Sequence, residues 1–504
     1  MVFATVVVLL FAVGVLPRWP GLGHLVALPP LDLITDLRIL MVEAPSYPAF
    51  LAGVLVSLAV RVTVLAFLLG GPSRQSLAYA ARYYLIMLGP AAVAAGLLLA
   101  SKATLYFGLF WIGLLATVVV VVLAAPAVWA APPRLARGFA DAFRHGQRSG
   151  TVGAYLVVLA GLGALADWAG ALGTVLFVPA SAGLTLVAAR ALRADPGLRA
   201  LRRTLAAGGA VLAAALVVIV AVGPAGPPRA PEPDAPRAGS LLLMSGVDSS
   251  SGSGAMLELD PHNLGYTCAQ TRYFSYAGPG DGQPRGRALC PITTGAPYQA
   301  RDTLRPTAQL IDFLEAQLAD MPPPVVLVTH SQGVWVTWQA AVRRRLPNVA
   351  VLVLVGPFPD NPVPYPPQGE QGRSRVAATV TALVSRGARP GGTSAFTPDS
   401  PLGREWLADP YAVEETLAHP LPEDIRALAV PSVFDLPLMP DGPALRTASD
   451  LCPVPVIHPN LPYSAEFQRA LAVFLDGRTP DSCPFWRPLV GHVFRPFTVA
   501  AWDD

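Results

Sequence analysis

The chain has 504 residues, of which 53% are hydrophobic and only 14% charged, and its formal net charge is +3. It is too apolar for one soluble domain, because soluble domains carry about a quarter charged residues. A net charge this small for the length gives no basis for binding nucleic acid. The apolar residues concentrate before residue 223, which predicts a membrane region followed by a soluble domain.

Residues 1–223 contain seven apolar stretches, each near the length that crosses about 30 Å of hydrocarbon. They cover approximately residues 2–16, 48–70, 83–100, 105–130, 151–166, 171–189 and 205–223. The first lacks a basic start and a small-residue cleavage site, so we expect a retained span rather than a signal peptide. The prediction for this domain is a helical transmembrane bundle of about seven spans.

Basic residues predict the orientation of the bundle, because short loops rich in Lys and Arg stay in the cytoplasm. Arginines gather in every second connection, namely at positions 74 and 82, at 134, 137, 144 and 148, and at 190, 193, 199, 202 and 203. The alternate connections hold few basic residues. The end of the seventh span is therefore predicted to lie outside, and everything after residue 223 is predicted to be extracytoplasmic.

Two polar features interrupt the membrane region. Arg61 falls near the middle of the second stretch, where a charge is costly and faces either a partner inside the bundle or a functional, water-filled cavity. The apolar stretches offer no obvious acidic partner at the same depth. The segment from Leu31 to Val42, which carries Asp32 and Asp36, is interpreted as an amphipathic helix on the outer surface or as a loop against the outer domain.

The cysteines agree with an outside location for the second half. All four follow residue 223, where disulfides form and persist. Three pairings are possible, and we favour the nearest ones, Cys268 with Cys290 and Cys452 with Cys483. Zinc binding is the rival interpretation, but no pair has C-x-x-C spacing. We therefore predict two disulfides, no metal site and no cofactor.

A proline-rich linker at residues 224–239 separates the membrane region from a domain at 240–504, because proline this dense favours an extended chain. The domain alternates strands and helices. Strands are predicted near residues 241–246, 273–278, 325–328 and 350–356, and helices at 302–319 and after residue 333. This order indicates a mostly parallel sheet with right-handed crossovers and helices on both faces.

The segment Thr329-His330-Ser331-Gln332-Gly333 joins a buried strand to a helix, so Ser331 lies on a tight turn. Such a turn exposes the hydroxyl and directs the first free N–H groups of the helix toward what it attacks. The segment resembles the nucleophile elbow, G-x-S-x-G, of the α/β-hydrolase family, with Thr329 in place of the first glycine. The resemblance covers residues 240–504 and none of the membrane region. An ordinary turn is the alternative interpretation.

The resemblance implies an oxyanion hole and a cap. The family takes one oxyanion N–H from the residue after the nucleophile, here Gln332, and another from the loop after an early strand, here Gly246 or Val247. The pattern of strands breaks at about residues 357–424, where the family carries a cap insertion that shapes the substrate pocket. An additional packing layer is the alternative for this insertion.

The family places its acid and base after the nucleophile, in the order Ser, acid, His. Asp441 lies in the loop after the strand at residues 427–435 and is the preferred acid. Asp435, at the end of that strand, is its competitor, and Asp450 is a more distant third. His458 follows the last predicted strand, residues 454–457, and is the predicted base.

These residues predict a membrane-anchored serine hydrolase that cleaves carboxylic esters outside the cytoplasm. A neutral imidazole takes the serine proton, and a buried carboxylate holds the imidazole in the required tautomer. Lipid or other acyl esters are the expected substrates, because the domain is tethered within reach of the lipid bilayer. Two alternatives stay open. The same triad could pass the acyl group to an alcohol, or the domain could be an inactive hydrolase-like binding module, with the activity near Arg61.

Overall fold

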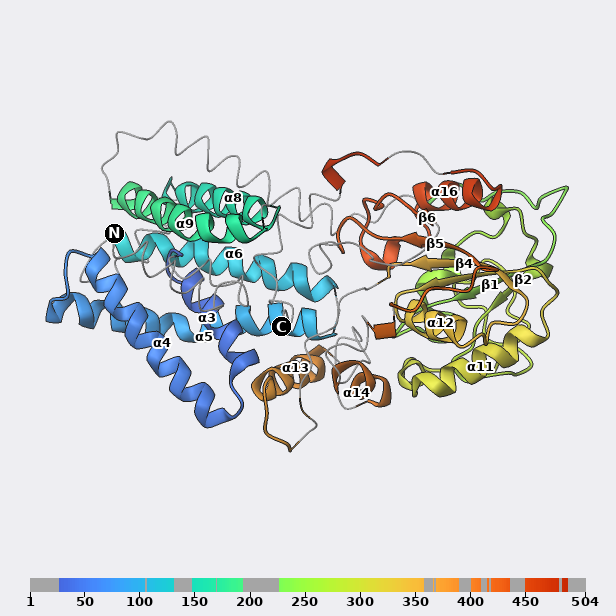
Figure 1. The fold of residues 1–504 in the computed structure, drawn as a ribbon, viewed down its shortest axis with the longest axis horizontal. Helices are drawn as coiled ribbons and strands as arrows, with labels where there is room; N and C mark the ends of the chain where they lie inside the picture. Colours follow the sequence, from blue (N-terminus) through green and yellow to red (C-terminus); the bar gives the residue numbers. More distant parts are fainter. Residues whose placement is uncertain are drawn as a thin grey trace. The chain divides into compact units, whose positions relative to one another are not determined.

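The fold is taken from a computed structural model, shown as a ribbon in Figure 1. It describes residues 27–104, 107–130, 147–168, 170–193, 226–357, 366, 369–388, 400–408, 415–416, 418–435, 449–479 and 483–487. The chain forms two compact units. The N-terminal unit contains residues up to 221 together with 368–384, and the C-terminal unit contains 222–367 and 385–491.

The N-terminal unit is helical. Its described helices are α3 (Leu31–Glu43), α4 (Tyr47–Leu68), α5 (Arg74–Thr104), α6 (Phe107–Ala130), α8 (Gln147–Trp168), α9 (Gly170–Arg193) and the greater part of α13 (Arg375–Ala388). Within the described part of the chain, three helices are long and apolar enough to cross a membrane: Tyr47–Leu68, Arg74–Ala103 and Leu109–Trp129.

The prediction of seven spans is not supported by these helices. The second, third and fourth predicted stretches coincide with the three long apolar helices. The fifth and sixth are helical as α8 and α9, but the apolar part of α8 covers only Gly150–Gly163. The first and seventh stretches lie outside the described residues.

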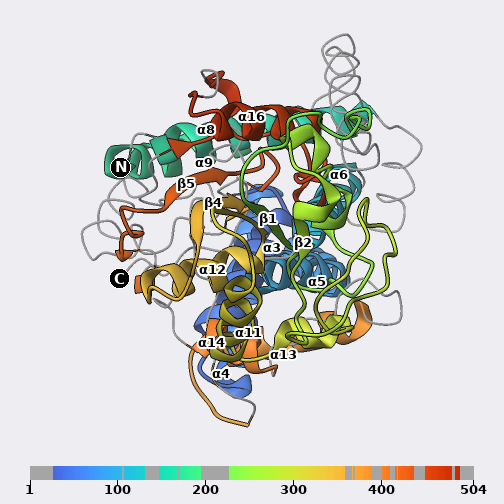
Figure 2. The same cartoon turned by 90° about the vertical axis from the view of Figure 1, so that its right-hand side faces the viewer.

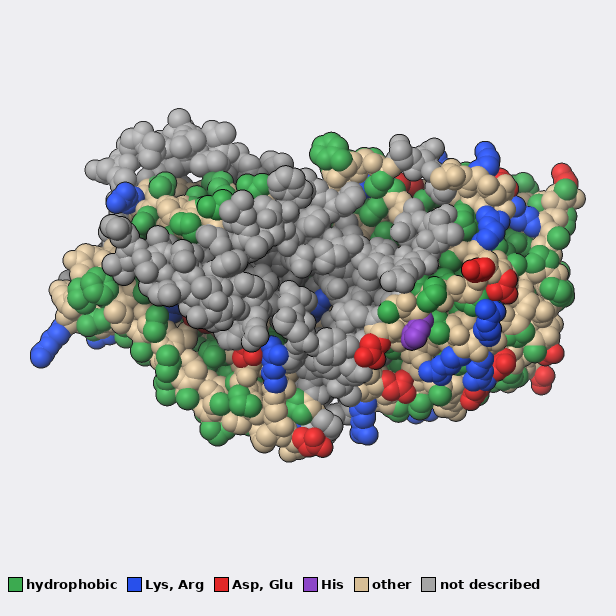
Figure 3. Space-filling view, in the orientation of Figure 1, with side chains coloured by type: hydrophobic (Ala, Val, Ile, Leu, Met, Phe, Trp, Pro, Cys, Tyr) green, Lys and Arg blue, Asp and Glu red, His purple; other side chains and the backbone are tan. Residues whose placement is uncertain are grey.

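Helix α4 has the surface expected of a membrane-spanning helix. Its N-cap is Ser46, whose side chain accepts a hydrogen bond from the Ala49 N–H at 3.3 Å. Large apolar side chains on α4 are exposed, namely Leu51, Leu55, Val56, Val60, Val64 and Phe67. Figure 3 shows apolar side chains over this helix, whereas charged side chains gather over the C-terminal unit. Exposed apolar area of this kind indicates contact with lipid.

The acidic partner of Arg61 comes from α3, which the sequence predicted to be an amphipathic helix on the outer surface or a loop against the outer domain. The Arg61 guanidinium donates to both carboxylate oxygens of Asp36, from Nε at 2.8 Å and from Nη2 at 2.6 Å. Asp32 lies 3.8 Å from the Arg61 Nε and accepts a hydrogen bond from the Tyr84 hydroxyl at 2.5 Å. Helix α3 is therefore packed against α4 and α5 inside the bundle, and Arg61 belongs to a buried ion pair.

The C-terminal unit is built on one sheet with the strand order β2-β1-β3-β4-β5-β6, in which every neighbouring pair is parallel. Its strands are β1 (Ser240–Met244), β2 (Thr271–Tyr273), β3 (Val325–His330), β4 (Val349–Val355), β5 (Arg426–Val430) and β6 (Ser449–Asp450). Strands β1 and β3 are buried at every residue. Continuous apolar strands of this kind form where helices cover both faces of a parallel sheet.

Helices lie on both faces of this sheet. Figures 1 and 2 show α11 (Thr307–Ala319) and α12 (Gln332–Val342) on one face and α16 (Ala465–Leu475) on the other. On its buried side, α16 contributes Phe467, Leu471 and Phe474 to the main apolar core. The predicted α/β class, with a parallel sheet between helices, is confirmed for this unit.

The last strand differs from the prediction of residues 454–457. Pairing with β5 occurs at Ser449–Asp450 instead, and Val454 makes only an isolated bridge with Ser432. Val454 lies between Pro453 and Pro455, neither of which has an N–H group for a strand ladder. The segment that leads to His458 is therefore irregular chain.

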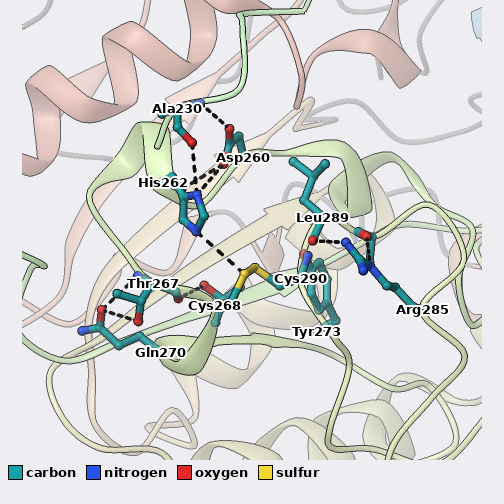
Figure 4. The surroundings of a disulfide bond; sticks show 12 residues. Ala230, Asp260, His262, Thr267, Cys268, Gln270, Tyr273, Arg285, Leu289 and Cys290 are labelled. Carbon is teal, nitrogen blue, oxygen red and sulfur yellow. Dashed lines mark hydrogen bonds and ion pairs between the residues drawn. A yellow bond between two sulfur atoms is a disulfide. The ribbon is translucent and has the colours of Figure 1, made fainter. Parts of the chain in front are cut away.

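Both predicted disulfides are present, Cys268–Cys290 and Cys452–Cys483. Figure 4 shows the first, which ties the chain just before β2 to the loop that follows it. The His262 Nε2 lies 3.8 Å from the Cys268 sulfur, and these two residues with Cys290 are the one possible metal-ligand group within the described residues. Both sulfurs are bonded to each other and are not thiolates, so this group is not a zinc site.

The described parts of the predicted cap, residues 357–424, fall in both units. Residues 368–384 group with the N-terminal unit, whereas α14 (Pro401–Ala408) belongs to the C-terminal unit. In α14, the Glu405 carboxylate accepts a hydrogen bond from the Thr307 N–H at 3.1 Å, at the start of α11. An acceptor at a helix N-terminus satisfies one of its free N–H groups and favours the helix dipole.

Candidate active site

Ser331 occupies a strained turn between β3 and α12. Its backbone has φ 57° and ψ −120°, a conformation that residues with a side chain rarely adopt. Strain of this kind costs about 1–3 kcal/mol and persists only where neighbouring structure enforces it. Here the Ser331 N–H donates to the Val355 carbonyl at 2.9 Å, which ties the turn to the end of β4. The turn has the form expected of a nucleophile elbow.

Thr329 fits at the position where the elbow pattern has glycine. Its side chain is fully buried, and its hydroxyl lies 3.3 Å from the Thr337 hydroxyl on α12. A Cβ atom on Gly333 would lie 3.4 Å from the Thr329 Cβ and 3.2 Å from the Met244 Cγ. Thr329 therefore packs beside Gly333 at the start of α12.

Gly246 and Gln332 lie beside Ser331, as the predicted oxyanion hole requires. A Cβ atom on Gly246 would lie 2.7 Å from the Ser331 Cβ and 3.3 Å from the Gln332 backbone nitrogen. The Gln332 side chain is buried and donates to the Thr303 carbonyl at 2.6 Å. The Gln332 backbone nitrogen thus lies near Gly246, whereas its side-chain amide is bonded to Thr303. Val247 follows Gly246 in the same loop.

His458 begins a 3-10 turn, His458–Asn460, and is paired with Asp435. The His458 Nδ1 lies 2.6 Å from the Asp435 Oδ2, and only 9% of His458 and 1% of Asp435 are exposed. Because a carboxylate only accepts, the imidazole donates its Nδ1 hydrogen, which leaves Nε2 as the basic nitrogen of the neutral ring. This is the tautomer that a general base for serine requires.

The loops that carry Asp435 and His458 are joined by several hydrogen bonds. The Ser432 hydroxyl donates to the Val456 carbonyl at 2.5 Å, and the Val433 N–H donates to the Val454 carbonyl at 2.9 Å. These bonds replace the strand ladder that the flanking prolines prevent. They fix the carboxylate against the imidazole.

Ser331 and His458 both lie at the end of β4. A Cβ atom on Gly356 would lie 2.6 Å from the His458 Cε1 and 2.9 Å from its Nδ1. The preceding residue, Val355, accepts the Ser331 N–H. Gly356 has φ +63°, which suits glycine, and its lack of a side chain makes room for the imidazole. Ser331 and His458 therefore flank the same strand end.

The carboxyl ends of β1 and β3 lie at the position where open parallel sheets bind ligands. The chain passes from β1 to β2 on one side and then to β3 on the other side of β1, so the strand order reverses between β1 and β3. Ligands bind outside the carboxyl ends of strands at such a switch point. Gly246 follows β1 and Ser331 follows β3, which places both at the reversal.

His330 also contacts His458. Its ring centroid lies 4.6 Å from that of His458, and its Nε2 lies 3.0 Å from the His458 carbonyl oxygen. A carbonyl only accepts, so Nε2 of His330 carries the hydrogen. The sequence analysis noted His330 only as the neighbour of the nucleophile. The signal for this contact was its position on β3, one residue before a serine whose base must lie nearby.

Burial and neighbouring groups shift the pKa values of Asp435 and His330. Burial raises the pKa of the Asp435 carboxyl, and the adjacent His458 and the Ser432 hydrogen bond oppose this shift. Burial, together with the positive charge of a protonated His458, lowers the pKa of His330 well below its usual 6.5. His330 is therefore neutral at pH 7.

His330 should make the stability of the protein depend on pH. In the unfolded chain His330 gains a proton below about pH 6.5, whereas in the folded protein it stays neutral. Its contribution to the free energy of unfolding is therefore complete above pH 6.5 and is lost as the pH falls. Unfolding of wild type and His330→Gln should be followed by tryptophan fluorescence at pH 5–7.5. Below pH 6.5, the free energy of unfolding of wild type should fall by up to about 1.4 kcal/mol more per pH unit than that of His330→Gln. If the free energies of unfolding of the two proteins depended on pH in the same way, His330 would not be a buried neutral histidine.

The structure thus brings together Ser331, His458, Gln332 and Gly246, all of which the sequence analysis had selected. Of the carboxylates considered, the described contact of His458 is with Asp435, the competitor of the preferred Asp441. Asp441 and the side chain of Asp450 lie outside the described residues. No known protein family, curated protein or solved structure matches the chain.

Proposed function

We propose that this protein is a serine hydrolase that cleaves carboxylic esters, with Ser331 as nucleophile, His458 as general base and Asp435 as the acid that orients it. The Ser331 hydroxyl attacks the ester carbonyl while its proton passes to the His458 Nε2. The N–H groups of Gln332 and of Gly246 or Val247 stabilise the oxyanion. The protonated imidazole then protonates the leaving alcohol, and water releases the acyl group from Ser331 by the same steps in reverse.

One observation carries this proposal. The His458 imidazole lies between the Asp435 carboxylate, at 2.6 Å, and the end of β4, to which the strained Ser331 turn is hydrogen-bonded. An ordinary turn would require neither a serine at φ 57° nor a buried imidazole–carboxylate pair beside it. The combination matches the roles of a nucleophile, a base and an orienting acid.

We place this site outside the cytoplasm on a membrane-anchored chain. The three long apolar helices and the lipid-facing surface of α4 support the anchor. The alternation of arginine-rich loops and the two disulfides of the C-terminal unit support the outside location. The expected partners are therefore the lipid bilayer and an acyl-ester substrate.

The proposal is tested on purified full-length protein in nanodiscs, with 4-methylumbelliferyl esters of increasing acyl length. We expect saturable release of the fluorescent alcohol and a free carboxylic acid in equal amounts. A matched amide should react far more slowly, because its leaving group is poorer. If folded, oxidised protein cleaves no ester, the C-terminal unit is a binding module and the proposal fails. If an added alcohol takes up most of the acyl groups, the enzyme is an acyltransferase.

A further inference from the structure

The loop that follows β1 passes directly against the turn of the candidate nucleophile. A Cβ atom on Gly246 would lie 2.7 Å from the Ser331 Cβ and 2.9 Å from the His330 carbonyl oxygen. A catalytic site needs its groups within about 0.5 Å of the productive geometry. The contacts that hold this loop therefore bear on the oxyanion hole. We call residues 245–249 the β1 loop.

Residues 246–249 form a β-turn that is closed twice by one residue. The Ser249 N–H donates to the Gly246 carbonyl at 3.3 Å, and the Ser249 hydroxyl donates to the same carbonyl at 2.7 Å. The third residue of the turn, Asp248, has φ 66°. Type II turns require a positive φ at this position, and aspartate tolerates it better than most residues. The Gly246 carbonyl is therefore directed into the turn.

Tyr298 orients the Ser249 hydroxyl. The Tyr298 hydroxyl donates to the Ser249 Oγ at 3.1 Å, which leaves the Ser249 hydrogen for the Gly246 carbonyl. Burial raises the pKa of Tyr298 to about 12, so its hydroxyl keeps its hydrogen at neutral pH. Two hydrogen bonds, at 2.8 and 3.0 Å, fix the backbone of Tyr298 to Ser251. Tyr298 thus donates to Ser249, and Ser249 donates to Gly246.

The rest of the β1 loop is held as well. The Tyr276 hydroxyl donates to the Ser245 carbonyl at 2.5 Å. The Asp248 N–H donates to the Thr303 hydroxyl at 3.3 Å. The Thr303 carbonyl in turn accepts the Gln332 side chain at 2.6 Å. Thr303 therefore links the β1 loop to the residue that follows the nucleophile.

The bound carbonyls determine where the N–H groups of the loop point. A peptide unit is planar and trans, so its C=O and N–H bonds point in opposite directions. Because the Gly246 carbonyl is directed toward Ser249, the Val247 N–H is directed out of the turn. The Ser245 carbonyl fixes the Gly246 N–H in the same way. The side chains that bind these carbonyls therefore orient both candidate donors of the oxyanion hole.

We propose that Ser249 and Tyr298 are positioning residues of the oxyanion hole, and that its second donor is the Val247 N–H. This inference rests on the proposed serine hydrolase activity of Ser331. The two hydroxyls act on the reaction through the Gly246 carbonyl, because they hold the next peptide with its N–H toward the oxygen that becomes negative. That oxygen carries its charge in the transition state, so the contribution is to kcat and hardly to substrate binding.

The test compares 4-methylumbelliferyl butyrate with its thionobutyrate analogue, in purified full-length protein in nanodiscs. Sulfur replaces the carbonyl oxygen in the analogue and accepts hydrogen bonds weakly, so an intact oxyanion hole favours the oxygen ester. Ser249→Ala should lower kcat for the oxygen ester at least tenfold with little change in KM. It should affect the thiono ester far less, so the ratio of the two rates falls. Ser253→Ala, at an exposed serine farther along the chain, should change neither rate.

Tyr298→Phe tests the hydrogen bond to Ser249 without removing the ring. It should lower kcat for the oxygen ester several-fold and reduce the same ratio. The double variant, Ser249→Ala with Tyr298→Phe, should be no slower than Ser249→Ala alone, because Tyr298 acts through the serine hydroxyl.

Three results would overturn the positioning role: an unchanged ratio in Ser249→Ala, an equal loss of both esters, or losses that multiply in the double variant. A reduced ratio in Tyr276→Phe but not in Ser249→Ala would make the Gly246 N–H the donor in place of Val247. Failure of wild type to cleave the oxygen ester would instead refute the hydrolase activity itself.

Discussion

Asp435→Asn should lower kcat for ester hydrolysis by about 10⁴, whereas Asp441→Asn should leave it within a few-fold of wild type. The Asp435 Oδ2 accepts the Nδ1 hydrogen of His458 at 2.6 Å. An asparagine there can present its NH₂ group to Nδ1, which then has to accept, and the hydrogen moves to Nε2. Nε2 is the nitrogen that must take the serine proton, so the variant holds the base in the wrong tautomer.

The two Asn variants are a matched pair, since each removes one carboxylate and keeps its size. Both should be assayed with 4-methylumbelliferyl butyrate, and their thermal unfolding should be compared to show that the fold is intact. The affinity for substrate should change little, because Asp435 acts through the imidazole. The reverse outcome, an active Asp435→Asn and an inactive Asp441→Asn, would transfer the role of the acid to Asp441.

Ser331→Ala should lose at least about 10⁴ in kcat, since no other group replaces the attacking hydroxyl. Its companion, Ser331→Gly, should be equally inactive but more stable, because glycine relieves the strain at φ 57°. Unfolding midpoints measured for wild type and both variants would separate the two effects. Equal stability of the Ala and Gly variants would mean that the turn is not strained. Residual turnover near the wild-type rate would exclude Ser331 as nucleophile.

The features that the sequence predicts well are those with strong local causes. The four apolar residues from Val325 to Val328 are buried on both faces, and the helix begins directly after Ser331, so the strand, turn and helix follow from local pattern alone. The disulfides pair neighbours in sequence because short loops close at lower entropic cost. The parallel sheet follows from the alternation of strands and helices.

The choice between Asp435 and Asp441 depends on long-range contacts. Both residues follow the same strand, and turn chemistry favoured Asp441. The structure pairs Asp435 with His458 because the Ser432 hydroxyl and the Val454 carbonyl join the two loops. Because prolines flank Val454, this segment forms an isolated bridge instead of a regular strand. The hydrophobic periodicity and the composition of the sequence do not reveal such a pairing.

The partner of Arg61 was missed for a similar reason. Hydropathy places Asp36 before the first long span and hence outside the bundle. The tight turn between α3 and α4, at residues 44–46, folds α3 back along α4 and brings Asp36 to the depth of Arg61. Helix hairpins of this kind depend on packing, as where Leu40 meets Gly53, and not on the hydrophobicity of either helix.

The most direct test of the account is the residue that a fluorophosphonate labels in the oxidised, full-length protein. The probe reacts with a serine only when a base and an oxyanion hole activate it. Peptide mass spectrometry should find the adduct on Ser331 in wild type, and labelling should fall sharply in His458→Ala. An adduct on another residue, or undiminished labelling of Ser331 without His458, would contradict a nucleophile activated by that imidazole.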